Sequence, residues 1–403
     1  MMITTVKLSD LKLSLHLIGT LCAALLLGSF LPTSLQSTFY AISITLKEIL
    51  LFVLPIVIFS CVFSCLLTLR GGKAVGLMIG LFTIVCVSNY FSTLIAYGVG
   101  SLGLINLDAF STVTDTVNPI QELTPLWHFD FPKWISNDQA LYLGFTFGSL
   151  FSFFPNPWAY RFSDIAKQYV TVFLEKVFVP VLPLFALGFI LKMQHDGILG
   201  KIIQSYLPLI VVVLITYIVH LALLFAIAAG FNLQRWILYL KNVLPVGLVG
   251  FSTMSSMATL PVTLKAAEKN TNSDDIARIV IPATVNIHMV GVGIAIPLMA
   301  FCILAGFGYE LPTFSAYCSF ALYFVLAQFA VAAVPGGAIL VMLPILETHL
   351  GFSGEMSALI TALYILFDPF VTVTNVLGNS ALVIMISKGF SRFRANVNER
   401  TKS

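Results

Sequence analysis

The sequence predicts an all-α membrane protein with several spanning helices. Apolar residues make up 58% of the 403 residues and charged residues only 10%, whereas about 25% of the residues in a soluble domain are charged. The mean hydropathy is +0.97, and apolar stretches long enough to cross a bilayer as a helix recur along the whole chain. This length leaves room for about eight spans joined by short loops.

Six segments in the first part of the chain are uniformly apolar and are expected to be spanning helices. They cover residues 13–31, 39–68, 75–102, 137–155, 166–193 and 203–230.

The six cysteines lie in or beside apolar stretches without a CxxC pair, which favours packing over metal binding or disulfides. The net charge of +3 is small, and no basic run is interleaved with aromatic residues, so no nucleic-acid partner is expected.

Charged residues in the loops predict an orientation in the bilayer. Basic residues gather at the N-terminus, at Arg70 and Lys73 and in the C-terminal tail, whereas the 103–135 loop is mainly acidic. By the positive-inside rule both termini are expected in the cytoplasm and the 103–135 loop outside, which implies an even number of crossings. The short loops suit a multi-pass protein of a bacterial inner cell membrane.

Two later segments are interrupted by residues that a plain spanning helix would not contain. Residues 236–265 carry the polar run STMSS at 252–256, and residues 318–346 are broken by VPGGA at 334–338. Non-helical backbone at membrane depth is tolerated only where protein or a water-filled cavity covers it. Paired interruptions of this kind point to a transporter binding site. Each segment is expected to be a re-entrant hairpin, with a kinked ordinary helix as the alternative.

The last apolar segment, 356–387, carries a polar stripe. Asp368, Thr372, Asn375 and Asn379 are spaced i, i+4, i+7 and i+11, which places them on one face of a helix. A carboxylate in the middle of a membrane costs roughly 2.5–3.5 kcal/mol on insertion scales, so it normally faces a protein interior or a wet cavity. An acid and two amides on one face therefore predict a binding site for a small polar solute or a cation.

Four parts of the chain together resemble the dicarboxylate/amino acid:cation symporters, the family that includes the glutamate transporters. They are residues 251–261 (FSTMSSMATLP), the apolar helix expected at 277–306, the Pro-Gly-Gly tip and the last span. The run PIV at 55–57 with Ser60 also fits. The resemblance covers most of the chain and is most specific between residues 236 and 388.

The resemblance implies a fold of eight transmembrane helices and two re-entrant helical hairpins, assembled as a homotrimer in the lipid bilayer. In this family the first, second, fourth and fifth helices form a trimerisation scaffold, and the remainder moves as an elevator-like transport domain. Residues 1–235 would hold the four scaffold helices together with transport-domain helices 3 and 6. The core transport domain, 236–388, would comprise hairpin 1 at 236–265, helix 7 at 277–306, hairpin 2 at 318–346 and helix 8 at 356–387.

The resemblance also implies a substrate site. Asp368 matches the aspartate that binds the substrate amine, and Asn375 matches the asparagine that binds substrate. Val371 stands where members with acidic substrates have an arginine, which favours a small neutral amino acid over an acidic one or a dicarboxylate. The implied substrate-binding residues are Ser255 and Ser256 of the first hairpin tip, Val334 of the second tip, and Asp368, Val371, Thr372 and Asn375.

The implied cation site departs from the family pattern. The seventh-helix motif Asn-Met-Asp-Gly-Thr falls on His-Met-Val-Gly-Val at 288–292, and a further cation-site aspartate falls on Asn379. Two sodium-binding carboxylates are therefore replaced, although amide and backbone carbonyl oxygens remain. His288 offers a proton site instead, because its unperturbed pKa lies near ~6.5. The implied cation-binding or proton-coupling residues are His288, Met289, Asn375 and Asn379.

The leading functional hypothesis is therefore a secondary active symporter that imports a small amino acid with Na⁺ or H⁺ and needs no other cofactor. A diverged member that works as an exchanger, anion channel or sensor is the alternative, favoured by the replaced carboxylates. An intramembrane enzyme is not expected. Asp368 has no second acid in a helix motif, and Ser252 lacks a complete GxSxG turn.

Overall fold

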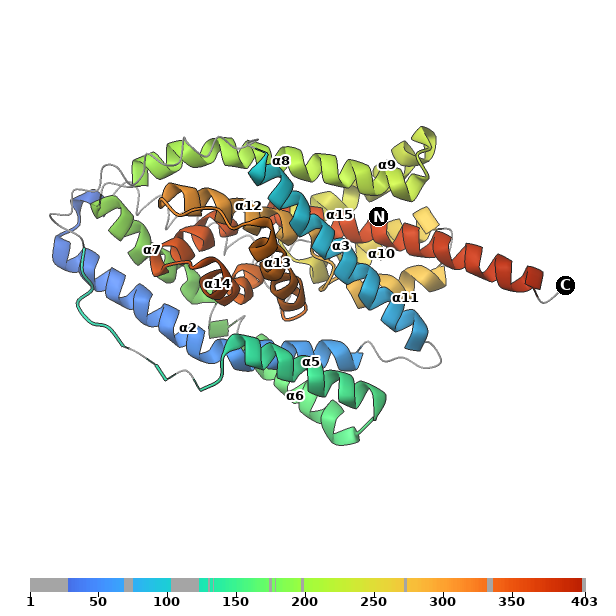
Figure 1. The fold of residues 1–403 in the computed structure, drawn as a ribbon, viewed down its shortest axis with the longest axis horizontal. Helices are drawn as coiled ribbons and strands as arrows, with labels where there is room; N and C mark the ends of the chain where they lie inside the picture. Colours follow the sequence, from blue (N-terminus) through green and yellow to red (C-terminus); the bar gives the residue numbers. More distant parts are fainter. Residues whose placement is uncertain are drawn as a thin grey trace.

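The structure is a computed structural model that describes residues 28–68, 75–102, 123–129, 131–132, 134–173, 176–177, 179–196, 199–271, 274–331 and 336–400. Within these ranges every regular element is helical (Figure 1). Most of the predicted first span and of the acidic 103–135 loop lies outside the described residues, as do Arg70, Lys73 and Val334.

The elements follow one another with short connections. They are η1 (Gly28–Phe30), α2 (Thr33–Thr68), α3 (Val75–Ser101), α5 (Asn137–Phe153), α6 (Pro157–Phe173), α7 (Val179–His195), α8 (Leu199–Ala229), α9 (Leu233–Thr253), α10 (Ser256–Thr271), α11 (Asp274–Thr284), α12 (Val290–Gly306), α13 (Phe314–Gln328), α14 (Gly337–Leu350) and α15 (Gly354–Arg400).

Five of the described helices are long and apolar enough to cross a membrane. The spans are Thr33–Leu67, Gly80–Ser101, Pro208–Ala229, Leu233–Thr253 and Gly354–Gly389. The helices α12, α13 and α14 are apolar but shorter. The prediction of an all-helical membrane protein is thus confirmed.

Each of two predicted helices corresponds to two elements in the structure. The span expected over 166–193 falls on α6, which is described up to Phe173, and on α7, which is described from Val179. Residues 174, 175 and 178 lie outside the described residues, so a continuous span here stays a prediction. The continuous helix expected over 277–306 is wrong. It breaks between α11 and α12, and residues 285–289 form a turn and an irregular stretch.

Both interrupted segments fold as pairs of packed helices. In the first, α9 ends at Thr253 and is followed by the C-cap residue Met254, whose φ of 48° lies in the left-handed region, and α10 starts at Ser256. The two helices pack against each other. In the second, α13 packs against α14, and their connection is described except for residues 332–335. The placement of the two connections at the membrane midplane stays a prediction.

The helices form two groups (Figure 1). Along one edge, α2 packs against α5, α6 and α7. In the centre, α12 is buried on all sides and contacts α3, α8 and α15. Helix α15 in turn packs against both helices of the first hairpin. The polar stripe of α15 is therefore enclosed by protein and not by lipid.

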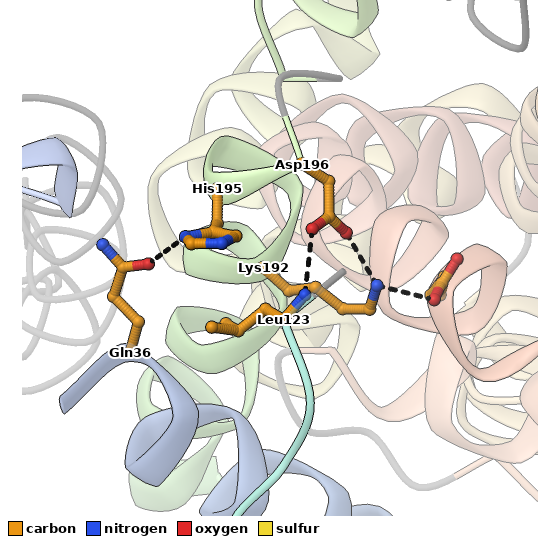
Figure 2. A network of polar contacts seen from close by, with 6 residues as sticks. Gln36, Leu123, Lys192, His195 and Asp196 are labelled. Atoms are coloured by element: carbon orange, nitrogen blue, oxygen red, sulfur yellow. Dashed lines mark hydrogen bonds and ion pairs between the residues drawn. The ribbon is translucent and has the colours of Figure 1, made fainter. Parts of the chain in front are cut away.

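Ion pairs join the two groups (Figure 2). Lys192 near the end of α7 pairs with Asp196 at 2.7 Å and with Glu355 in the first turn of α15 at 3.2 Å. The backbone N–H of Leu123 donates to the second oxygen of Asp196 at 3.3 Å. Nearby, Lys47 of α2 pairs with Glu347 of α14 at 3.0 Å.

Candidate functional site

Asp368 lies inside the protein, in the first third of α15, with 6% of its surface exposed. Its Oδ2 accepts a hydrogen bond of 2.9 Å from the backbone N–H of Gly336. Gly336 is the N-cap residue of α14 and has a φ of 71°, a conformation that glycine adopts without steric cost. Asp368 therefore supplies the negative charge that the N-terminus of α14 favours. This contact joins the second hairpin to the polar stripe.

Two tyrosines complete the surroundings of the Asp368 carboxylate. Tyr364, one helical turn earlier, hydrogen-bonds to it through its hydroxyl. Tyr217 of α8 is buried close enough to interact with its charge. None of the ion pairs found among the described residues involves Asp368. The site thus holds a buried carboxylate that no positively charged side chain in the described ranges compensates.

Asn375 lies two turns farther along the stripe and binds the start of α12. Its Oδ1 accepts a hydrogen bond of 2.8 Å from the N–H of Gly291. A Cβ added to Gly291 would lie 2.7 Å from the carbonyl oxygen of Val371, so only glycine lets α12 approach α15 this closely. Val371 itself is buried, with 1% of its surface exposed.

The first hairpin approaches the stripe through its α9 helix. A Cβ on Gly250 would lie 3.1 Å from Val376 and 3.8 Å from Thr372, so this glycine brings α9 against α15. Ser255 and Ser256 at the connection are half-buried. The Ser255 hydroxyl accepts from the N–H of Ala258 at 3.3 Å and so caps the first turn of α10. Within the described part of the chain, the hydrogen bonds of Ser255 stay inside the hairpin and do not reach α15.

The break between α11 and α12 is held by α3. The Asn89 side chain donates to the carbonyl of Ile287 at 2.7 Å and accepts from the N–H of Met289 at 3.0 Å. His288, between them, is 1% exposed and its Nε2 lies 2.8 Å from the Ser88 hydroxyl. These contacts satisfy backbone groups that an interrupted helix leaves unpaired. Sequence reasoning missed Ser88 and Asn89, although two consecutive polar residues in an apolar span were a usable signal.

Asn379 contacts the end of α11. Its Oδ1 lies 2.6 Å from the Thr284 hydroxyl, which is also 2.7 Å from the Val280 carbonyl. One hydroxyl proton cannot serve both acceptors. Rotating the side-chain amide of Asn379 by 180° places its NH2 group, instead of its oxygen, beside the Thr284 hydroxyl. Thr284 then donates to the Val280 carbonyl and accepts from Asn379, and both contacts are satisfied. The amide oxygen of Asn379 then becomes the buried atom that lacks a partner among the described residues, together with Oδ1 of Asn286.

Comparison with known proteins identifies the family. Residues 13–389 match the sodium:dicarboxylate symporter family. The chain belongs to this family. The resemblance derived from the sequence is thereby confirmed, and with it a glutamate-transporter-like helical membrane fold.

Several transporters are similar to part of this chain. Human excitatory amino acid transporter 1 is 30% identical over 206 residues, which cover 50% of this chain and 37% of that protein. Mouse excitatory amino acid transporter 5 is 30% identical over 195 residues, covering 48% and 34%. The proton/sodium-glutamate symport protein of Bacillus caldotenax is 29% identical over 192 residues, covering 46% and 44%. The matched regions thus span less than half of these relatives.

Val290, which stands where the family's seventh-helix motif has an aspartate, is tightly packed in the structure. Val290, at the first position of α12, is fully buried. A Cβ added to Gly378 of α15 would lie 2.6 Å from a methyl group of Val290. An apolar side chain therefore fills this position tightly against the backbone of α15. A carboxylate here would need a cation or hydrogen-bond donors to compensate its burial.

Proposed function

We propose that this protein is a secondary active symporter that imports a small neutral amino acid together with Na⁺ or H⁺. The buried carboxylate of Asp368 carries the proposal. A charge inside a membrane protein normally has a partner, and no ion pair among the described residues supplies one. The ammonium group of an amino acid would supply the missing charge. Asn375 and the amides near Ser255 and Ser256 would bind the substrate carboxylate.

Val371 favours a neutral substrate. A hydrogen bond to a charged group contributes roughly 1.5–3 kcal/mol, and valine offers none to a side-chain carboxylate. An acidic substrate is the alternative, supported by the glutamate named in the Bacillus caldotenax relative. Uptake assays with both substrate classes separate these possibilities.

The coupling cation is Na⁺ or H⁺. Oxygen atoms are the preferred ligands of hard cations, and the unpaired buried amide groups of Asn286 and Asn379 support Na⁺. The buried imidazole of His288, whose Nδ1 has no partner among the described residues, supports H⁺. Met289, beside it, belongs to the same proposed cation site.

The proposed architecture places the trimerisation scaffold mainly within residues 1–235 and the core transport domain at 236–388. The protein would act as a homotrimer in the cell membrane, with both termini in the cytoplasm. A second candidate function is an exchanger, anion channel or sensor. Val290 and Asn379 favour it, because they stand where the family's cation carboxylates are expected.

The test is uptake into liposomes that contain the purified protein. Labelled serine, alanine, aspartate and glutamate would be supplied under a Na⁺ gradient or a H⁺ gradient, with Asp368→Asn as the matched control. We expect serine or alanine to accumulate above equilibrium under one gradient, and the control to be inactive. Accumulation of aspartate or glutamate, insensitive to excess serine, would replace the neutral substrate by an acidic one. Exchange without accumulation under either gradient would favour the second function.

A further inference from the structure

The backbone of Gly291 is held from two sides at the start of α12. Its N–H donates to Oδ1 of Asn375 on α15 at 2.8 Å. Its carbonyl accepts a hydrogen bond of 2.9 Å from the hydroxyl of Tyr217 on α8. Three helices therefore meet at one residue, next to the proposed substrate site.

This arrangement fixes the orientation of the Asn375 side chain. An amide group has an acceptor oxygen on one side and two N–H donors on the other. Because the oxygen is engaged by Gly291, the donors point the opposite way and are available to a carboxylate. The orientation of the Asn375 amide depends on where the Gly291 N–H lies. The backbone of Gly291 is held in turn, through its carbonyl, by the hydrogen bond from Tyr217.

The burial and the hydrogen bond of Tyr217 fit a role in holding Gly291. It is 3% exposed, and burying a hydroxyl without a partner is costly, so the bond to Gly291 specifies its position. The same ring lies close enough to Asp368 to interact with its charge. No motif in the sequence identifies Tyr217.

We propose that Tyr217 is a positioning residue of the substrate site, which holds the backbone of Gly291 and through it the Asn375 amide. This inference rests on the proposed function. A site that is ordered before the substrate arrives binds more tightly, because less conformational freedom is lost on binding. Removing the Tyr217 hydroxyl should therefore weaken substrate affinity more than it slows the transport cycle.

The chain offers a matched control for this test. Tyr317 of α13 is also fully buried, and its hydroxyl donates to the carbonyl of Thr93 on α3 at 2.6 Å. Tyr217→Phe and Tyr317→Phe each remove one hydroxyl from a bond between two helices. Both should lower the melting temperature. Only Tyr217→Phe should raise the Kd and the KM for serine or alanine, by about three- to tenfold as expected for one hydrogen bond, with a smaller change in kcat.

A double-mutant cycle tests the route through Asn375. In an Asn375→Ala background the effect of Tyr217→Phe on Kd should disappear, because the group that it positions is absent. Equal Kd values for Tyr217→Phe and Tyr317→Phe would overturn the proposal. So would an effect of Tyr217→Phe that persists unchanged in the Asn375→Ala background.

Amide hydrogen exchange provides a readout that needs no substrate. Tyr217→Phe should speed exchange in a peptide that covers residues 288–295, whereas Tyr317→Phe should not. If the wild-type protein binds none of the four amino acids, the proposed function fails while this comparison still tests the role of Tyr217. Unchanged exchange in Tyr217→Phe would then count against it.

Discussion

Two buried aspartates of this protein have opposite surroundings. Asp196 is bound to the ammonium group of Lys192 at 2.7 Å, with side-chain exposures of 5% and 7% (Figure 2). Asp368 is buried as a whole residue, but its partners among the described residues are a backbone N–H and a tyrosine hydroxyl. A carboxylate that already has a cation stabilises the fold. A carboxylate held only by neutral donors can still attract a cation, which is the basis of the proposed function.

Replacing the unpaired carboxylate should have the largest effect on function. We expect Asp368→Asn to reduce amino acid uptake by more than about a hundredfold, because the charged hydrogen bonds to the substrate ammonium are lost. The melting temperature should stay the same or rise, since a buried uncompensated charge has been removed. Uptake in liposomes and thermal unfolding measure the two effects. Wild-type uptake by this variant would contradict the role of Asp368.

Removing Lys192, the cation paired with Asp196, should have the opposite pattern: the main loss should be in stability and not in uptake. Lys192→Met leaves Asp196 buried without its partner, which typically costs about 3–5 kcal/mol of folding free energy. Denaturant unfolding in detergent measures the loss. The double variant Lys192→Met/Asp196→Asn is the control and should recover much of the stability. If the single variant is as stable as the wild type, the ion pair contributes nothing and the contrast between the two aspartates fails.

Introducing an arginine at position 371 should test which class of substrate the site prefers. Val371→Arg introduces a guanidinium group that can bind a side-chain carboxylate, with a gain of roughly ten- to a hundredfold for aspartate over serine. Val371→Met adds a long side chain without charge and controls for the change in volume. Competition between labelled serine and unlabelled aspartate measures the preference. An unchanged preference in a folded Val371→Arg protein would show that this position does not select the substrate.

Adding one methyl group at the helix junction should have a smaller effect. Gly291→Ala places a Cβ within 2.7 Å of the Val371 carbonyl, and overpacking of this kind costs about 1–3 kcal/mol. Unfolding experiments and the Kd for serine or alanine should both detect the change. Gly247→Ala is the control, because its added Cβ would meet the nearest atom only at 3.7 Å. Equal behaviour of the two variants would mean that the junction relaxes freely.

The smallest effect is expected at an exposed ion pair. Arg278 and Glu268 lie 3.1 Å apart, with the arginine side chain 60% exposed. Exposed pairs contribute about 0–1 kcal/mol, so Glu268→Gln should change the free energy of unfolding by less than about 1 kcal/mol. The loss of stability in this variant is the reference for an exposed ion pair, with which the loss in Lys192→Met is compared. A loss as large as that of Lys192→Met would mean that exposure does not explain the difference.

The polar stripe of α15 could be predicted because helical spacing is a local property. The positions of Asp368, Asn375 and Asn379 on one face follow from residue numbers alone. The helix break before α12 was missed because it depends on Asn89, which lies 200 residues away from Met289 in the chain.

The class of the protein follows from the amino-acid sequence alone. Its hydrophobic segments specify helices in a membrane, and the polar residues of the last span specify a protected site. The valine at position 371 is also read directly from the sequence and already restricts the substrate chemistry.

The contacts that build the site come from the packing of helices that are distant in the sequence. Gly336 reaches Asp368 from another helix, and Tyr217 reaches Gly291 across 74 positions of the chain. Such contacts depend on the packing of α8, α12, α14 and α15 against one another, and the pattern of one helix carries no information about which side chain of another helix will face it. The physical reason is that hydrogen bonds act over about 3 Å in space, whereas helical periodicity reports only on neighbours along the chain.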